Sequence, residues 1–342
     1  MKKLISLLLV VCLALTLTAC GGAKKPAASS TDTSAAPSAD TNAKVYKVAM
    51  ICDSPISDGG WGAACYNGMV DAAKANGWET AYTDSIDQSA YADSMISYCD
   101  LGYDMIFVPG NQYSDAVKQV AADYPNVYFA VLNGSETLPT ANVESMLPDA
   151  KQIGSIAGII AGLMSKSNVI GFIGGMELDT TKAKLANFES AAKVINPSIK
   201  AVSAYAGSFN DTAKGMELAA SMINDGADVF FGDASAVDSG ARQAIDQANG
   251  TSGIKIFDIG QPADLLGQNP CVACSVVTDN AGMISLCMKA VQDGTFGNKV
   301  VYGNLENGCV YLGKFNDQLI NADTQAKINE YIKQLQDGTF GK

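Results

Sequence analysis

Four aspartates stand where short apolar runs give way to polar segments: Asp53, Asp58, Asp233 and Asp258. An ionised carboxylate accepts hydrogen bonds and can hold two neighbouring hydroxyl groups of a small ligand. It would repel a phosphate. Aspartate in such a place also caps the N-terminus of a following helix, and both roles are open for Asp58. These carboxylates predict recognition of a neutral polar ligand, with Asp258 as the candidate for holding vicinal hydroxyls.

Two aromatic residues lie in similar polar segments. Trp61 follows a loop rich in Asp and Gly, and Phe209 lies within the sequence GSFND. Apolar neighbours are absent around both. Each ring either covers the nearby hydrophobic core or stacks on a flat ligand group, and stacking contributes about 1–3 kcal/mol per base. Asn111 occupies a further polar segment of this kind. These residues extend the candidate binding site.

Catalytic signatures are missing from the sequence. The chain has no histidine, the commonest general acid–base, and it contains no nucleophile elbow, P-loop, zinc-protease or dinucleotide fingerprint. Cys271 and Cys274 form the only close cysteine pair, which indicates two thiols or a local disulfide rather than a zinc site. We therefore expect a binding protein that is not an enzyme and has neither cofactor nor metal.

The elements that must position these residues alternate along the chain. Short β-branched or aromatic runs, beginning with VYKVAMI at Val45, are separated by amphipathic stretches of about 10 to 18 residues. Such alternation predicts parallel sheets covered by helices on both faces. Ligands bind at the carboxyl ends of the strands in sheets of this type. The polar segments described above would then meet at one cleft.

The alternation restarts near Asn168, which predicts two Rossmann-like lobes joined by a hinge, as in type I periplasmic-binding proteins. We expect the first lobe to comprise residues 45–148 plus 274–301. The second would comprise residues 149–273 plus 302–342.

The first 44 residues read as export and tethering segments. Lys2 and Lys3 precede an apolar run that ends at Ala19-Cys20, which predicts a lipoprotein signal peptide over residues 1–19 and a lipid anchor at Cys20. Residues 20–44 lack bulky apolar side chains and are expected to be a flexible tether. The protein would then lie on the outer face of the cell membrane, attached through its lipid.

The formal charge excludes another class of partner. The net charge of −12 becomes about −14 when Lys2 and Lys3 are removed, because 21 basic residues then oppose 35 acidic ones. An acidic chain without a basic cluster does not bind nucleic acid through its phosphates.

Several longer phrases lie along most of the chain from Val45 onward: SDGGWGAACYNG, GIIAGLMSKSNVIGFIGGME, NFESAAKVINP, YAGSFNDTAKG, GADVFF and IFDIGQ. Through these phrases the sequence resembles the basic membrane protein family of ABC-transporter substrate-binding lipoproteins, whose members bind purine nucleosides.

The resemblance implies that Trp61 and Phe209 sandwich a base and that Asp53, Asp58, Asp233 and Asp258 make polar ligand contacts. Three positions depart from the family's pattern: Gly62, Asn133 and Thr278 stand where relatives often have asparagine, an acidic residue and lysine. The function implied is capture of a nucleoside, a purine above all, and its delivery to an ABC permease. A sugar or polyol ligand, or a ligand-sensing surface lipoprotein, is the alternative.

Overall fold

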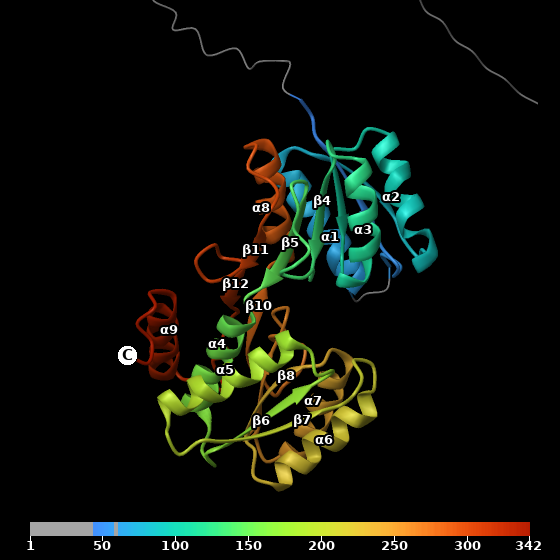
Figure 1. The fold of residues 1–342 in the computed structure, drawn as a ribbon. Coiled ribbons are helices and arrows are strands. Elements are labelled where there is room, and N and C mark those ends of the chain that lie inside the picture. The colour runs from blue at the N-terminus through green and yellow to red at the C-terminus, as the bar shows by residue number, and fades with distance from the viewer. Residues whose placement is uncertain (1–43, 58–60) are drawn as a thin grey trace, which may run out of the picture. The chain divides into compact units, whose positions relative to one another are not determined.

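The computed structural model describes residues 44–57 and 61–342. The predicted signal peptide, tether and lipid anchor, together with Asp58, lie outside the described residues. From Val45 onward the chain forms two sheets of six strands each (Figure 1). All strands of the first sheet are parallel, in the order β11-β5-β4-β3-β1-β2. They are β1 (Lys47–Ile51), β2 (Glu79–Thr83), β3 (Met105–Val108), β4 (Tyr128–Leu132), β5 (Val143–Pro148) and β11 (Val300–Gly303).

Helices cover both faces of this first sheet. In β1, Val48 and Met50 pack into one core while Ala49 and Ile51 pack into another, as the two-residue period of a strand requires. The first core includes α1 (Trp61–Asn76) and α8 (Asn280–Gln292). The second includes α2 (Tyr91–Asp100) and α3 (Ser114–Asp123), which follow the short 3-10 helices η1 (Gln88–Ala90) and η2 (Asn111–Tyr113).

The second sheet has the order β12-β10-β9-β8-β6-β7, with only β12 antiparallel to its neighbour. Its strands are β6 (Val169–Gly174), β7 (Lys200–Tyr205), β8 (Val229–Asp233), β9 (Phe257–Gly260), β10 (Val272–Thr278) and β12 (Val310–Leu312). One face packs against α4 (Ala150–Met164), α5 (Asp179–Ile195) and α9 (Ala322–Gln336), and the other against α6 (Thr212–Asn224) and α7 (Ala236–Asn249). The two covered parallel sheets confirm the expected fold class.

In the described part of the chain, the backbone crosses between the sheets after β5, after β10 and after β11 (Figure 1). The expected boundary at residue 274 falls inside β10, which belongs wholly to the second sheet because Val272–Thr278 is one continuous buried run. The boundary expected after residue 301 falls inside β11, which pairs with β5 as far as Gly303. Both crossings therefore come a few residues later than the sequence indicated.

Helix α4 carries glycine on one face, at Gly154, Gly158 and Gly162. A Cβ atom at Gly154 would lie 2.2 Å from the Lys184 carbonyl oxygen, and one at Gly158 would lie 2.3 Å from that of Phe188. The missing side chains let α5 approach α4 backbone to backbone. This close packing fixes the first turns of α5, which face the cleft described below.

The seven cysteines among the described residues are buried free thiols. Cys271 packs with α6 and α7, whereas Cys274 packs into the core on the opposite face of the sheet. The two thiols therefore lie on opposite faces of the sheet and form no disulfide with each other. No helix in the described ranges is long and apolar enough to span a membrane.

Candidate binding cleft

A cleft of about 680 Å³ lies at the carboxyl ends of the strands, with walls from both lobes. This volume is in the range of small-molecule sites. Three of the residues predicted from the sequence line it: Asn111, Phe209 and Asp233. They are joined by Asn133, Glu136, Asp179, Thr181 and Lys184 among others.

Asp233 ends strand β8 and is held by a polar network. Its Oδ1 atom accepts hydrogen bonds from Lys184 Nζ at 2.7 Å and from Gln261 Nε2 at 3.2 Å. Its Oδ2 atom accepts from Thr181 Oγ1 at 2.7 Å. The carboxylate is therefore fixed by groups of its own lobe, and its charge is balanced by an ammonium group that the sequence reasoning had not placed in the site.

The Phe209 ring packs against Gly175, directly after strand β6. A Cβ atom at Gly175 would come within 2.4 Å of the Phe209 ring, so only glycine allows this placement. The Phe209 carbonyl accepts a hydrogen bond from the Ala236 amide at 3.0 Å. That amide follows Ser235, whose φ of 55° is rare for a residue with a side chain. Phe209 is thus positioned by two contacts, the packing of its ring against Gly175 and the hydrogen bond from the Ala236 amide to its carbonyl.

Asp53 lies two residues beyond the end of strand β1 in the first lobe. Its carboxylate accepts hydrogen bonds from Tyr91 Oη at 3.0 Å and Gln112 Nε2 at 3.1 Å, and its backbone amide donates to Tyr113 Oη at 2.7 Å. Partial burial raises the pKa of Asp53, but the hydrogen bonds from Gln112, Tyr91 and other neighbours outweigh it, so the pKa lies below its usual range. Asp53 does not line the cleft, and its partner Gln112 is the chain neighbour of the lining residue Asn111.

Trp61 begins helix α1 and does not line the cleft itself. Its indole Nε1–H donates to the Pro109 carbonyl at 2.8 Å, two residues before the cleft-lining Asn111. The side chain is 36% exposed. This one hydrogen bond fixes the edge of the indole at the rim, while much of its surface faces solvent. Asn111 itself accepts a hydrogen bond from Ser114 Oγ at 2.8 Å.

Asp258 requires a correction. It lies in the middle of β9, is 4% exposed, and does not line the cleft. Its Oδ2 atom accepts from Arg242 Nη1 of helix α7 at 3.2 Å, an ion pair with both side chains largely buried. The strand's alternation turns Asp258 toward α7, on the opposite face of the sheet from Phe257 and Ile259. The sequence-based expectation that Asp258 holds ligand hydroxyls is therefore not supported.

A second buried carboxylate lies beside this ion pair. Asp238, at the start of α7, accepts a hydrogen bond from the Ala234 amide at 2.9 Å, while its Oδ1 atom has no polar partner among the described residues. Burial raises the pKa of Asp238 to about 7, and the neighbouring charge of Asp258 adds to the effect, against the lowering influence of Arg242.

Asp238→Asn should therefore change how stability depends on pH. Because the folded-state pKa is raised, the stabilising effect of protonated Asp238 is complete below the unfolded pKa of 3.8 and is lost as pH rises through about 7. We expect the melting temperature of Asp238→Asn, relative to the native protein, to rise between pH 5 and pH 8. A difference that stays constant over this range would contradict the raised pKa.

Thr181 and Lys184 are the site residues that sequence reasoning missed. They lie three positions apart in the first turns of α5, so they share one helix face. That spacing after the strand ending GFIGG was a usable signal. A lysine on a helix is ordinarily solvent-exposed, however, and nothing in the sequence indicated that Asp233 would be its partner.

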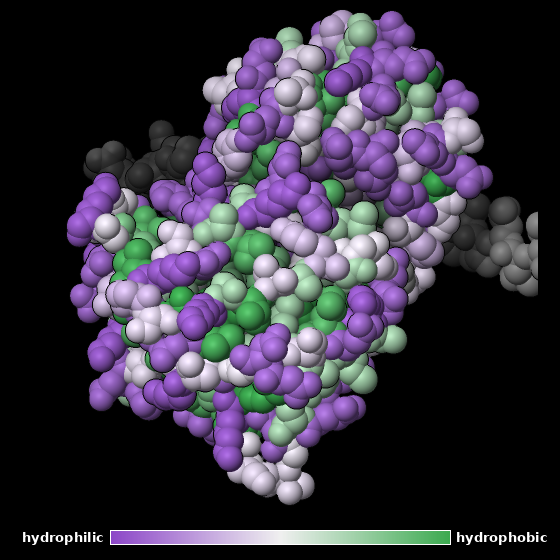
Figure 2. All heavy atoms as spheres, turned by 60° about the horizontal axis from the view of Figure 1, so that its bottom comes forward, coloured by the Kyte–Doolittle hydropathy of each residue, from purple (hydrophilic) through white to green (hydrophobic). Residues whose placement is uncertain are grey.

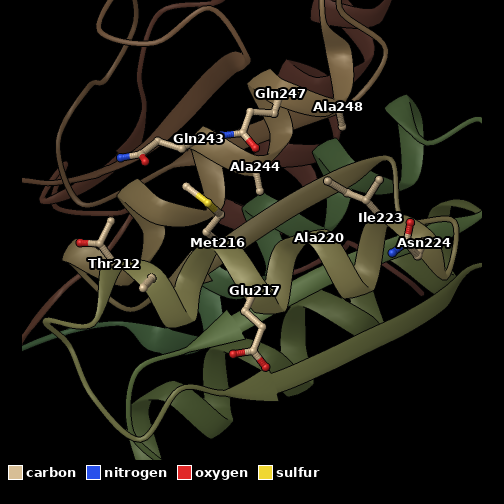
Figure 3. Close-up of a pocket in the computed structure, with 11 residues that line it drawn as sticks. Thr212, Met216, Glu217, Ala220, Ile223, Asn224, Gln243, Ala244, Gln247 and Ala248 are labelled. Atoms are coloured by element: carbon tan, nitrogen blue, oxygen red, sulfur yellow. The ribbon is translucent and has the colours of Figure 1, made fainter.

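A second hollow, about 850 Å³, lies between α6 and α7 on the second lobe (Figure 3). It is a shallow groove lined by Met216, Ala220, Ile223, Ala244 and neighbouring residues, with Glu217 as its one acidic group. On the face shown in Figure 2, hydrophobic side chains lie in small patches between hydrophilic ones. None of the residues predicted for ligand binding reaches this groove, so the inter-lobe cleft is the better candidate site.

The fold and the cleft together define a two-lobed small-molecule-binding protein of the periplasmic-binding type. Similarity to a solved ABC transporter solute-binding protein from Conexibacter woesei supports the fold, with a TM-score of 0.71 over 86% of this chain and 97% of that one at 22% identity. The family model described as "ABC transporter substrate-binding protein PnrA-like" matches residues 45–339. The chain belongs to this family, which confirms the resemblance stated from the sequence.

Two relatives illustrate the range of names in the family. The ABC transporter nucleoside-binding protein BmpA of Lactococcus lactis is 28% identical over 299 residues, covering 82% of this chain and 85% of the relative. The CD4+ T-cell-stimulating antigen of Listeria innocua is 27% identical over 319 residues, covering 87% and 88%. Family membership makes this chain an extracytoplasmic substrate-binding protein of an ABC transporter.

Proposed function

We propose that the protein captures a nucleoside, a purine nucleoside above all, in the inter-lobe cleft and delivers it to an ABC permease. In this proposal the base stacks on Phe209 and Trp61, and the chain is held at the outer face of the cell membrane by a lipid on Cys20. The lobes close around the ligand, and the permease recognises the closed form.

The main support is the placement of Phe209. Its ring lines the cleft, is held against Gly175, and adjoins the polar pair Lys184 and Asp233. A flat apolar face beside charged hydrogen-bonding groups suits a heteroaromatic ring better than a sugar alone. The relative named as a nucleoside-binding protein supports the same class of ligand.

A thermal-shift and calorimetric panel on the purified chain tests this proposal. The panel compares inosine, guanosine, adenosine, uridine, ribose and glucose. A ligand that binds only the folded state stabilises it by about 2.7 kcal/mol when the ligand concentration is about 100 times its Kd. We expect stabilisation by purine nucleosides. Stabilisation by the sugars alone would contradict the proposal.

The same panel should include nucleoside 5′-monophosphates. Among the described residues, three carboxylates line the cleft, those of Glu136, Asp179 and Asp233, against one ammonium, that of Lys184, which is already paired with Asp233. The uncompensated negative charge should repel a phosphate. We expect each neutral nucleoside to bind more tightly than its monophosphate, and equal or tighter binding of the monophosphate would show that another surface holds the ligand.

A further inference from the structure

The ion pair between Lys184 and Asp233 forms part of the cleft wall. Its Nζ–Oδ1 distance is 2.7 Å, and the side chains are 14% and 21% exposed. Both residues line the cleft, so the remaining exposed surface of the pair faces the space that a ligand would occupy. The pair is rigid, because α5 is held close to α4 at Gly154 and because Thr181 and Gln261 also bond Asp233.

The hydrogen-bonding capacity of this pair is not exhausted. An ammonium group has three donors, and Lys184 uses two of them, on Asp233 Oδ1 and on Gln261 Oε1 at 3.1 Å. An ionised carboxylate accepts about four hydrogen bonds, and Asp233 accepts three from described residues, those from Lys184, Gln261 and Thr181. Among the described residues, this leaves one donor on Lys184 and one acceptor position on Asp233 Oδ2 without a partner.

Lys184 and Asp233 line the same cleft as the Phe209 ring, and Gly175 connects the two groups. Gly174 pairs with Asp233 across neighbouring strands, and the Gly175 amide donates to the Asp233 carbonyl at 3.0 Å. Phe209 covers Gly175, and neighbouring strands are about 4.8 Å apart. A flat ligand stacked on Phe209 therefore presents its edge to Lys184 and Asp233.

We propose that Lys184 and Asp233 read the edge of a 6-oxopurine, so that inosine and guanosine are preferred over adenosine. This inference rests on the proposed nucleoside function. Lysine can only donate and so requires an acceptor, which the O6 carbonyl supplies. The unused position on the Asp233 carboxylate requires a donor, which the adjacent N1–H supplies. O6 projects from the ring and has two lone pairs, so it can accept from the Lys184 ammonium while that group stays paired with Asp233. N1 of adenine has a single lone pair, in the plane of the ring.

Purine riboside provides the test, because it lacks both O6 and N1–H but keeps the ring and the sugar. By calorimetry we expect the native protein to bind inosine about 10- to 150-fold more tightly than purine riboside, the range for hydrogen bonds to charged groups. Adenosine should bind more weakly than inosine. In Lys184→Met the ratio of inosine to purine riboside affinity should fall toward one.

Lys182→Met is the matched control, because Lys182 lies on the same helix with a 51% exposed side chain in a 3.8 Å ion pair with Glu177. It should keep the native ratio. A native ratio near one, tighter binding of adenosine than inosine, or an unchanged ratio in Lys184→Met overturns the inference. The first two outcomes need no variant and hold even if Lys184→Met fails to fold. If no nucleoside binds, the proposed function fails too, whereas nucleosides that bind without this ratio overturn the inference alone.

Discussion

Truncating either aromatic ring, in Phe209→Ala or Trp61→Ala, is expected to weaken nucleoside binding by about 1–3 kcal/mol, or about 5- to 150-fold in Kd. Phe209 lines the cleft and Trp61 lies at its rim on the opposite lobe. Loss of either stacking face leaves one side of the base against water. Isothermal titration of each variant with inosine measures the effect.

Tryptophan fluorescence tests the role of Trp61 separately, because Trp78 is the other tryptophan in the chain. The chain has two tryptophans, and Trp78 is 7% exposed and stacked on Tyr46 with ring centroids 4.9 Å apart. Ligand should alter the emission of the native protein and of Trp78→Phe, but not that of Trp61→Ala. If Trp61→Ala binds with native affinity, Trp61 does not contact the base, which would then stack on Phe209 alone.

Arg242→Met is expected to destabilise the fold by about 3–5 kcal/mol, the usual cost of removing one partner of a buried ion pair. Arg242 is the cation beside Asp258, and the side chains of the pair are 14% and 6% exposed. Its loss leaves the carboxylates of Asp258 and Asp238 buried near each other without a compensating charge. Denaturant unfolding at pH 7.5 measures the change in the free energy of unfolding.

Two controls distinguish this effect from a simple packing defect. The double variant Arg242→Met/Asp258→Asn removes the unpaired charge and should recover most of the lost stability, so the two changes are non-additive. Lys289→Met breaks an exposed ion pair with Asp293 and should cost no more than about 1 kcal/mol. An Arg242→Met protein as stable as the native one, or a double variant no better than the single, would contradict this account.

The stability lost in Arg242→Met should also depend on pH. Burial outweighs the lowering effect of Arg242 and raises the pKa of Asp258, and removing Arg242 should raise it further. Protonation at low pH then neutralises the stranded carboxylates. The destabilisation of Arg242→Met should thus be smaller at pH 5 than at pH 7.5.

The sequence by itself determined the type of each main element and the ends of the strands at which ligands bind. Apolar runs such as residues 47–51 are buried on both faces, and a short run of that kind between polar segments is typical of a strand in a covered parallel sheet. Asp233 ends such a run, and Phe209 lies in the loop that follows strand β7, so their arrival at the cleft depends on connectivity that is visible along the chain.

The tertiary structure alone decided which side chains face the cleft. Asp258 and Asp233 both belong to strands of the second sheet, yet Asp258 turns toward α7 and pairs with Arg242, while Asp233 reaches the cleft at the end of β8. Lys184 enters the site because glycines on α4 let α5 pack closely. A one-residue shift in register reverses the face of a strand residue, and contacts between distant helices leave no local pattern. Those long-range contacts, rather than local sequence, select the ligand-facing groups.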